Sequence, residues 1–284
     1  MVTRNRSEGW KHAKISGHAN ENDITNKINN NNIFRENLEK KLNLKSSIKF
    51  AEVGGLNEKN VEDIFGGKTK SKTDLKIILK NKKKINISIK KSLGGQVYLI
   101  GVDRFLNGFE IQFKKKIDED IKRAFKLFFS GANDILQIID SAVLSKIEEK
   151  KKIKIKKYEK RKKRITWLTF EEYNLQLSLK FIEWFKQNIN DIFLFCFERG
   201  LSNNKEEWAD FIWYKNELME NEIDFVFDIK KMYKTINNNQ FKQMIVQGST
   251  LGGTTLKLPF GFVQWHQSQI QFHHNFELMN NLSK

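Results

Sequence analysis

A stretch of alternating side chains constrains the fold of this chain more than any other feature. In the segment KINISIK at 84–90, isoleucines alternate with Asn86, Ser88 and Lys90. Successive side chains of a β-strand point to opposite faces, so this strand would have one apolar and one polar face. The β-rich run LKIIL at 75–79 precedes it and is separated from it by a lysine-rich turn. The two runs predict a β-hairpin with one face in the core.

Apolar periodicity predicts helices over most of the remaining chain. Helices are expected at 17–46, with an interruption at 29–32, at 57–65, at 117–147, at 170–197 and at 208–233. A short strand is expected at 48–55, and the glycines, threonines and alternating aromatic residues of 243–277 indicate strands and turns.

The positive charge of the chain is concentrated in two windows. The sequence has 51 Lys and Arg against 34 Asp and Glu, a net charge of +17, and the windows 68–92 and 145–164 each carry a net +9. Clustered cations of this kind are typical of a surface that binds a polyanion such as nucleic acid. For 145–164 alone, a solvated lysine-rich helix is an equally good interpretation.

The cysteine content and the hydropathy indicate the cellular compartment of the protein. Cys196 is the only cysteine, so neither an internal disulfide nor a cysteine-rich zinc site can form. No window has the roughly 18 uninterrupted apolar residues of a membrane span, and the N-terminal residues do not resemble a signal peptide. We expect a soluble, intracellular protein in a reducing compartment.

The predicted hairpin also carries a chemically suggestive pair of side chains. Asp74 opens its first strand, and pairing of the two strands can bring this carboxylate beside Lys90. A carboxylate and a lysine on adjacent strands can hold a divalent cation and orient a water molecule for attack on a phosphodiester. Mg²⁺ suits such a hard oxygen site. An ordinary lysine-rich hairpin without a site is the alternative.

These residues resemble the motif of the PD-(D/E)xK nucleases, and in particular that of type II restriction endonucleases. Thr73 and Asp74 stand where that family has Pro and Asp, and Ser88-Ile89-Lys90 stands for its acid-x-Lys, sixteen residues on from Asp74 to Lys90. The chain departs from the pattern at Thr73, which replaces the proline, and at Ser88, which replaces the second acidic ligand.

The resemblance implies roles for several residues. Asp74 would bind the metal ion, Lys90 would position or help activate the attacking water, and Glu21, from an early helix, would complete the metal site. In place of the missing acid, the Ser88 hydroxyl, the Ile89 carbonyl or the Glu52 carboxylate would take up coordination. The implied cofactor is Mg²⁺.

Candidate DNA-contacting residues surround this motif or lie in the basic and C-terminal segments. Glycines after the second strand permit close approach of a phosphate, and Gln and His alternating with aromatic residues near the C-terminus can contact bases or phosphates. For any single Gln or His, a structural role on a sheet edge is the alternative, and the His spacing matches no strong zinc signature. The candidates are Lys14, His18, Lys91, Ser92, Gln96, Lys160, Arg161, Lys162, Gln264, His266, Gln269 and His273.

The resemblance and the predicted elements together imply an α/β (α+β) fold. We expect a central mixed β-sheet flanked by helices, with a helical insertion and a C-terminal β-rich segment. The expected segments are a nuclease core at 1–116, a largely helical region at 117–242 and the C-terminal segment at 243–284, in one compact unit.

The function implied is that of a type II restriction endonuclease, which hydrolyses double-stranded DNA at a short specific site with Mg²⁺. We expect a homodimer in the bacterial cytoplasm, without membrane association. Two alternatives stay open: a non-catalytic nucleic-acid-binding protein, which the missing second carboxylate favours, and a PD-(D/E)xK nuclease of another role, such as DNA repair.

Overall fold

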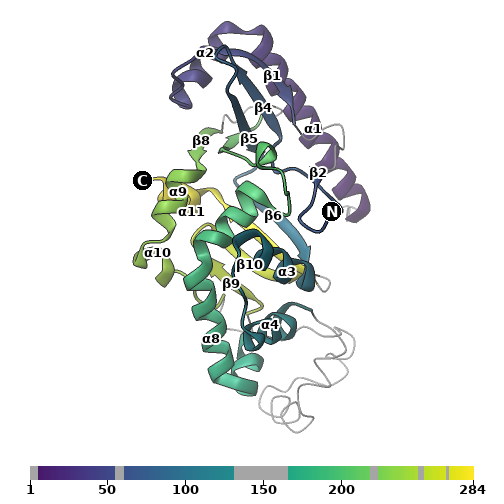
Figure 1. The fold of residues 1–284 in the computed structure, drawn as a ribbon, viewed down its shortest axis with the longest axis vertical. Coiled ribbons are helices and arrows are strands. Elements are labelled where there is room, and N and C mark those ends of the chain that lie inside the picture. Colours follow the sequence, from purple (N-terminus) through teal and green to yellow (C-terminus); the bar gives the residue numbers. More distant parts are fainter. Residues whose placement is uncertain (1–5, 55–60, 131–165, 218–222, 249–252, 267–268) are drawn as a thin grey trace, which may run out of the picture. The chain divides into compact units, whose positions relative to one another are not determined.

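The chain forms two compact units, each assembled from two separate stretches of sequence. The computed structural model describes residues 6–54, 61–130, 166–217, 223–248, 253–266 and 269–284 (Figure 1), and within these ranges the side chains outside 6–16, 130, 168, 169 and 172. The first unit comprises 1–93 with 197–232, and the second comprises 94–196 with 233–284. This division differs from the predicted segments 1–116, 117–242 and 243–284, because residues 211–228 join the sheet of the first unit.

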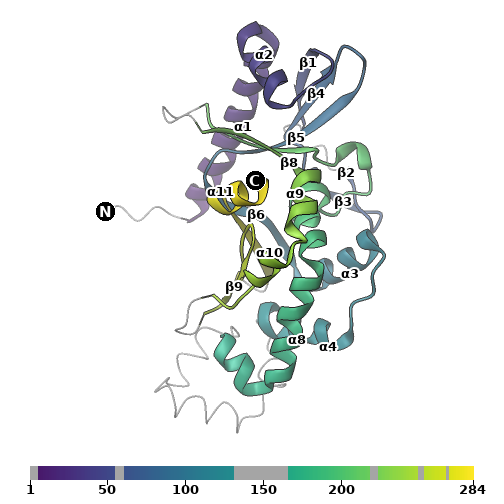
Figure 2. The ribbon, with the colours of Figure 1, turned by 90° about the vertical axis from the view of Figure 1, so that its left-hand side faces the viewer.

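The first unit is built on a five-stranded mixed sheet. The strand order is β1-β4-β5-β7-β8, in which β5 and β7 are parallel and the other neighbours are antiparallel. Two helices, α1 (Arg6–Asn30) and α2 (Asn32–Lys41), pack next to each other, and α1 contacts β1 (Figure 2). The strands are β1 (Ile48–Val53), β4 (Leu75–Leu79), β5 (Lys84–Lys90), β7 (Phe211–Lys215) and β8 (Asp224–Asp228), and a small antiparallel ribbon pairs β2 (Val61–Glu62) with β3 (Lys68–Thr69). The expected central mixed sheet flanked by helices is confirmed.

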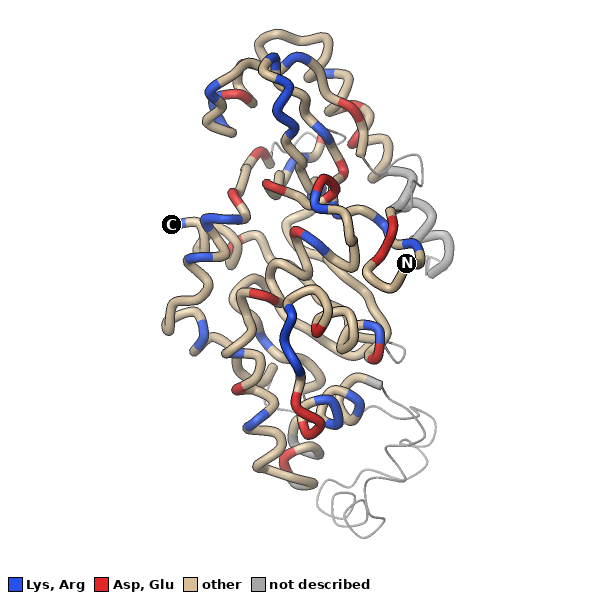
Figure 3. Tube along the Cα trace, in the orientation of Figure 1, with Lys and Arg blue, Asp and Glu red and all other residues tan. Residues whose placement is uncertain are grey.

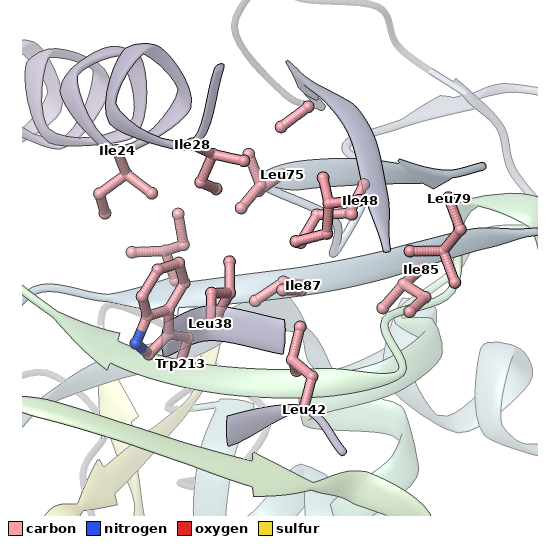
Figure 4. Close-up of a cluster of buried hydrophobic side chains, with 13 residues drawn as sticks. Ile24, Ile28, Leu38, Leu42, Ile48, Leu75, Leu79, Ile85, Ile87 and Trp213 are labelled. Atoms are coloured by element: carbon pink, nitrogen blue, oxygen red, sulfur yellow. The ribbon is translucent and has the colours of Figure 1, made fainter. Parts of the chain in front are cut away.

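One face of this sheet forms the core of the first unit. The alternating isoleucines of β5 and the leucines of β4 meet Ile24 and Ile28 of α1, as Figure 4 shows. Leu38 and Leu42 of the α2 region, Ile48 and Ala51 of β1 and Trp213 of β7 complete the cluster. Each fully buried aliphatic side chain of this kind contributes about 1.5 to 3 kcal/mol to folding. Burial of the isoleucines therefore fixes which face Ser88 and Lys90 occupy.

Residues 206–210 contact the opposite, polar face of the hairpin along part of its length. The side-chain nitrogen of Asn86 donates hydrogen bonds to the carbonyl oxygens of Glu206 (2.7 Å) and Trp208 (2.8 Å). Lys76, which is the register partner of Asn86, forms an ion pair with Glu207. Further along this face, towards the C-terminal end of β5, the side chain of Ser88 contacts that of Asp74.

The second unit contains a four-stranded antiparallel sheet and an aromatic helical core. The strand order is β6-β11-β10-β9, and Phe105, Phe125 and Phe181 are fully buried among the helices. The strands are β6 (Gly94–Gly101), β9 (Thr255–Leu258), β10 (Gly261–His266) and β11 (Gln269–Asn275), and the helices are α3 (Val102–Phe113), α4 (Glu119–Phe125), α8 (Trp167–Leu194), α10 (Asn239–Gln243) and α11 (Phe276–Ser283). The helix α9 (Ile229–Ile236) crosses from the first unit into the second.

Most of the predicted elements are confirmed, and two predicted helices are wrong. The helix break at 29–32, the hairpin at 75–89, the helix at 170–197 and the strands of the C-terminal segment are all present, and 117–130 is helical in part. Instead of a helix, 208–233 forms β7, β8 and the start of α9, because the FIWYK run of β7 is buried on both faces and so lacks a strand-like alternation. The predicted helix at 57–65 is wrong at its described end, where Val61–Glu62 pairs with β3. Residues 57–60, and 131–147 of the helix predicted at 117–147, lie outside the described residues.

None of the helices in the described ranges is long and apolar enough to cross a membrane.

Candidate functional site

The hairpin brings Asp74, Ser88 and Lys90 into one chain of hydrogen bonds. Lys90 Nζ lies 2.6 Å from Ser88 Oγ, and Ser88 Oγ in turn donates to Asp74 Oδ2 at 3.1 Å. The backbone N–H of Ile89 donates to the same Asp74 oxygen at 2.7 Å. The serine at the position of the missing second acid therefore links the lysine to the remaining carboxylate. We call these three residues the Asp–Ser–Lys chain.

Asp74 is held by the sheet on both of its sides. Its backbone N–H donates to the carbonyl of Ile87 at 2.9 Å, and its carbonyl accepts from Gly54 N–H at 3.0 Å. The buried Thr73 hydroxyl donates to the carbonyl of Glu207 at 2.9 Å and so fixes the residue before it. Both hydrogen bonds to the Asp74 carboxylate go to Oδ2, so Oδ1 accepts none from the described side chains and N–H groups. One carboxylate oxygen is thus available to a cation.

Glu21 of α1 lies close enough to this chain for the charges to interact. Burial, with a further contribution from the charge of Asp74, raises the pKa of Glu21 to about 8, while Lys90 and Lys91 act in the opposite direction. His18, one turn earlier, has its Nδ1 3.5 Å from Glu21 Oε2. The structure therefore places together two carboxylates, from α1 and from the residue before β4, and a lysine from β5.

Two asparagine side chains fasten α1 to the sheet and thereby position Glu21. Asn20, only 1% exposed, donates from Nδ2 to the carbonyl of Lys215 (3.0 Å) and accepts the N–H of Glu217 at Oδ1 (2.7 Å). Asn29 likewise donates from Nδ2 to the carbonyl of Ala51 (2.9 Å) and accepts the N–H of Ala51 at Oδ1 (2.8 Å). Each amide satisfies one backbone donor and one acceptor, as a neighbouring strand would. The helix is therefore fixed both along and around its axis.

The lysines of the hairpin fall into two groups along the strands. Figure 3 shows the Lys and Arg positions along the trace; the exposed lysines at 80 and 82–84 lie at the turn, at the end of the hairpin away from the Asp–Ser–Lys chain. Lys91 follows β5, and its carbonyl accepts a hydrogen bond from the side chain of Asn216 at 3.0 Å. Ser92 is exposed next to it. The predicted contacts of Lys91, Ser92 and His18 with DNA stay predictions.

The structure places the other candidates of the first unit differently. Glu52 lies on β1 opposite Lys76 and is exposed, whereas Glu21 is largely buried beside the Asp–Ser–Lys chain. Lys14 lies in α1, among residues whose side chains are not described. The basic window 145–164, with Lys160, Arg161 and Lys162, lies outside the described residues.

The C-terminal candidates lie on the sheet of the second unit. Gln264 and His266 are on β10, Gln269 and His273 are on β11, and Gln96 is on β6. All five are at least partly exposed. They belong to a different unit from the Asp–Ser–Lys chain, so the structure separates the candidates into two groups.

The first unit offers few oxygen ligands for a hard cation. Within the described ranges, no three His, Cys, Asp or Glu side chains gather closely enough to hold a metal ion. Glu21 and Asp74 supply two carboxylates, with the Ile89 carbonyl close by. Mg²⁺ typically takes one or two protein carboxylates and keeps several waters or phosphate oxygens, so this set fits Mg²⁺.

Sequence reasoning missed the residues that hold the site together. Asn20, Asn29 and Asn216 each bond a backbone group of a distant segment. No signal in the sequence distinguishes them, since asparagines are frequent along the chain, as in the run NNNN at 29–32.

Comparison with known proteins supports the fold. No protein-family pattern and no curated protein sequence matches the chain. A solved structure of the restriction endonuclease MspI in complex with its cognate DNA is similar, with a TM-score of 0.50 and 12% sequence identity over 95% of this chain and 93% of that one. This likeness shows a restriction-endonuclease-like fold.

Proposed function

We propose that the chain is a type II restriction endonuclease, which hydrolyses double-stranded DNA at a short specific site with Mg²⁺. The Asp–Ser–Lys chain beside Glu21 is the observation that carries the proposal, because it joins by hydrogen bonds the three residues that stand at the motif positions, with a serine in place of one acid. The restriction-endonuclease-like fold and the net charge of +17 agree with it.

Each residue has a role that follows from its contacts. Asp74 offers Oδ1 to a cation while its Oδ2 is held by Ser88 and by the backbone of Ile89. Lys90, held at 2.6 Å by Ser88, would stabilise the negative charge that develops on the phosphate and orient the attacking water. Ser88 is therefore a positioning residue for the lysine as well as a replacement for the absent acid.

Glu21 and Asp74 would hold the Mg²⁺ ion. Bound there, the ion would supply Lewis-acid polarisation of the phosphate and a water of lowered pKa. Two neighbouring carboxylates repel each other without a cation, which is one reason why Glu21 keeps its proton up to about pH 8. Loss of this proton is a precondition for Glu21 to act as a ligand.

Incubation of the purified full-length chain with plasmid DNA and Mg²⁺ tests the proposal. Discrete fragments are expected from the wild type, and no cleavage is expected from Asp74→Asn or Lys90→Ala at the same protein concentration. The conservative Glu36→Gln variant is the matched control, because Glu36 is an exposed acid on α2 outside the Asp–Ser–Lys chain.

The outcomes separate the alternative functions. A smear of fragments would replace the restriction enzyme with a non-specific nuclease, such as one acting in repair. Retarded migration without cleavage, in Mg²⁺ and in Mn²⁺, would favour the non-catalytic DNA-binding protein that the missing second carboxylate suggests. Sedimentation of the chain with and without duplex DNA tests the proposed homodimer.

A further inference from the structure

The four-stranded sheet of the second unit has two faces of opposite character. The apolar face is almost inaccessible, with Val263, Ile270 and Phe272 each 0% exposed. On the opposite face the side chains of β10 and β11 are polar apart from Phe262, and most of them are partly exposed. That face carries Gln264, His266, Gln269, Gln271 and His273, together with Gln96 of β6.

Three glutamines on this face form a continuous row across three strands. Gln264 Nε2 donates to Gln271 Oε1 at 2.8 Å, and Gln271 Nε2 donates to Gln96 Oε1 at 2.7 Å. We call these three residues the amide row. With strands about 4.8 Å apart, the row is about 10 Å wide. Among the described residues, the row leaves Gln96 Nε2 at one end and Gln264 Oε1 at the other without a hydrogen-bond partner.

An aromatic pair supports the row from one side. The His273 ring stacks on the Phe262 ring with centroids 4.3 Å apart and planes 9° apart. His273 Nε2 also lies 3.3 Å from Gln264 Nε2. Burial lowers the pKa of His273, and His266 lowers it further, which favours the neutral ring at neutral pH. The side chains of the row are therefore held in place before any ligand binds.

The face is rich in hydrogen-bonding groups but nearly without charge. None of the four strands β6, β9, β10 and β11 contains an Asp or Glu, and Lys257 is their only Lys or Arg. Phosphate recognition relies on Lys and Arg, whereas base edges are read by neutral amides that donate and accept together. Absence of carboxylates also removes repulsion from a nearby phosphate backbone. The chemistry of the face thus matches base edges better than it matches phosphates.

We propose that this face reads base edges in the major groove of duplex DNA, with the amide row as the element that discriminates between bases. The inference rests on the proposed function and adds the surface that gives it sequence preference. The major groove is about 12 Å wide and the amide row spans about 10 Å, so the ends of its side chains can lie across the groove. Glutamine pairs best with the N6 and N7 edge of adenine, so the preferred site includes at least one A·T pair.

Selection of bound duplexes from a random pool, without divalent metal, tests the inference independently of cleavage. The wild type should enrich one short sequence containing A·T, and Gln264→Ala and Gln96→Ala should each lower the preference for it over random DNA by about 5- to 100-fold. Affinity for random DNA should change less than twofold, because phosphate contacts lie elsewhere. Gln240→Ala, an exposed glutamine of α10 in the same unit, is the matched control and should leave the preference unchanged.

A second measurement locates the contact on the base. Replacement of the adenines in the enriched site by 7-deazaadenine removes the N7 acceptor, so the wild type should bind it more weakly and the Gln264→Ala or Gln96→Ala variant should lose nothing further. Since Gln96 is exposed, its alanine variant should fold normally even if Gln264→Ala does not.

The results distinguish this inference from the proposed nuclease function. Wild-type protein that enriches no sequence, or variants that retain the wild-type preference, would overturn the inference even if plasmid is cut. An enriched sequence that depends on the amide row, from a protein that cuts no DNA, would support the inference and refute the nuclease.

Discussion

Replacing Glu21 by Gln should make the protein more stable than the wild type at alkaline pH and remove part of its pH dependence. The glutamine mimics the protonated carboxyl group, which is the form that the folded protein keeps up to about pH 8. In the unfolded chain the same group has a pKa near 4.5 and is ionised at neutral pH. Between these two values, folding binds one proton at this position.

The sign and the size follow from proton linkage. Because the folded state binds more protons than the unfolded state, the free energy of unfolding falls as the pH rises from 4.5 to 8, by about 1.4 kcal/mol per pH unit. Between pH 5 and pH 8 the wild type should therefore lose about 4 kcal/mol relative to Glu21→Gln. Above pH 8 both states are ionised, and the difference should level off.

Urea unfolding in EDTA at intervals between pH 5 and pH 9, followed by circular dichroism, measures this difference. Glu36→Gln is the matched control, since Glu36 is an exposed acid on α2, and the difference between this variant and the wild type should stay small across the range. Added Mg²⁺ should stabilise the wild type more at pH 8 than at pH 6, because the ion competes with the proton for Glu21. Parallel curves for wild type and Glu21→Gln would show that Glu21 is not buried beside Asp74, and the metal site would lose its second carboxylate.

Four other changes test separate parts of the structure. Lys90→Ala should lower the rate of plasmid cleavage about 100- to 1000-fold while DNA binding in EDTA is retained. Ser88→Ala should lower the single-turnover rate of DNA cleavage about tenfold, because the contact that positions Lys90 is lost. An unchanged rate would show that Ser88 does not position the lysine. Asn20→Ala should destabilise the protein by about 2 to 4 kcal/mol in urea unfolding, because two buried backbone groups lose their partners; a loss below about 0.5 kcal/mol would contradict that contact. Replacing the four cations at 160–163 by Gln should reduce the slope of log affinity against log salt by about 3.6, and the parent slope would assign the phosphate contacts to other lysines.

The local part of the candidate site could be predicted from the sequence, because it depends on short-range periodicity. The alternation in β5 places Ser88 and Lys90 on one face, and the pairing of Leu75 with Ile87 brings Asp74, the residue before β4, to the end of the hairpin where Ser88 lies. Strand β7 could not be predicted in this way. Its run of large apolar residues has the same composition as a buried helix, and its parallel partner β5 lies more than 100 residues earlier.

The surroundings of the site could not be predicted from the sequence either. The burial of Glu21 depends on the docking of α1, which Asn20 secures by bonds to residues 195 and 197 positions away. Hydrogen bonds between residues so far apart produce no periodic pattern in a single sequence. The row of glutamines on the second unit was predicted as a set of candidates, but their hydrogen bonds to one another depend on strand order, which composition does not determine.

The hydrogen bonds that Asn20 makes with 215–217 determine when a nascent chain can assemble the candidate site. Glu21, Asp74, Ser88 and Lys90 all leave the ribosome well before 215–217, the segment that supplies both hydrogen-bond partners of Asn20. Loop closure over nearly 200 residues is a late event in folding, since non-local contacts form after local ones. A chain that is still being synthesised, or that is truncated before β7, therefore contains every residue of the site but lacks the contact that holds the helix in register. Assembly of the site thus depends on synthesis having passed β7 and Glu217.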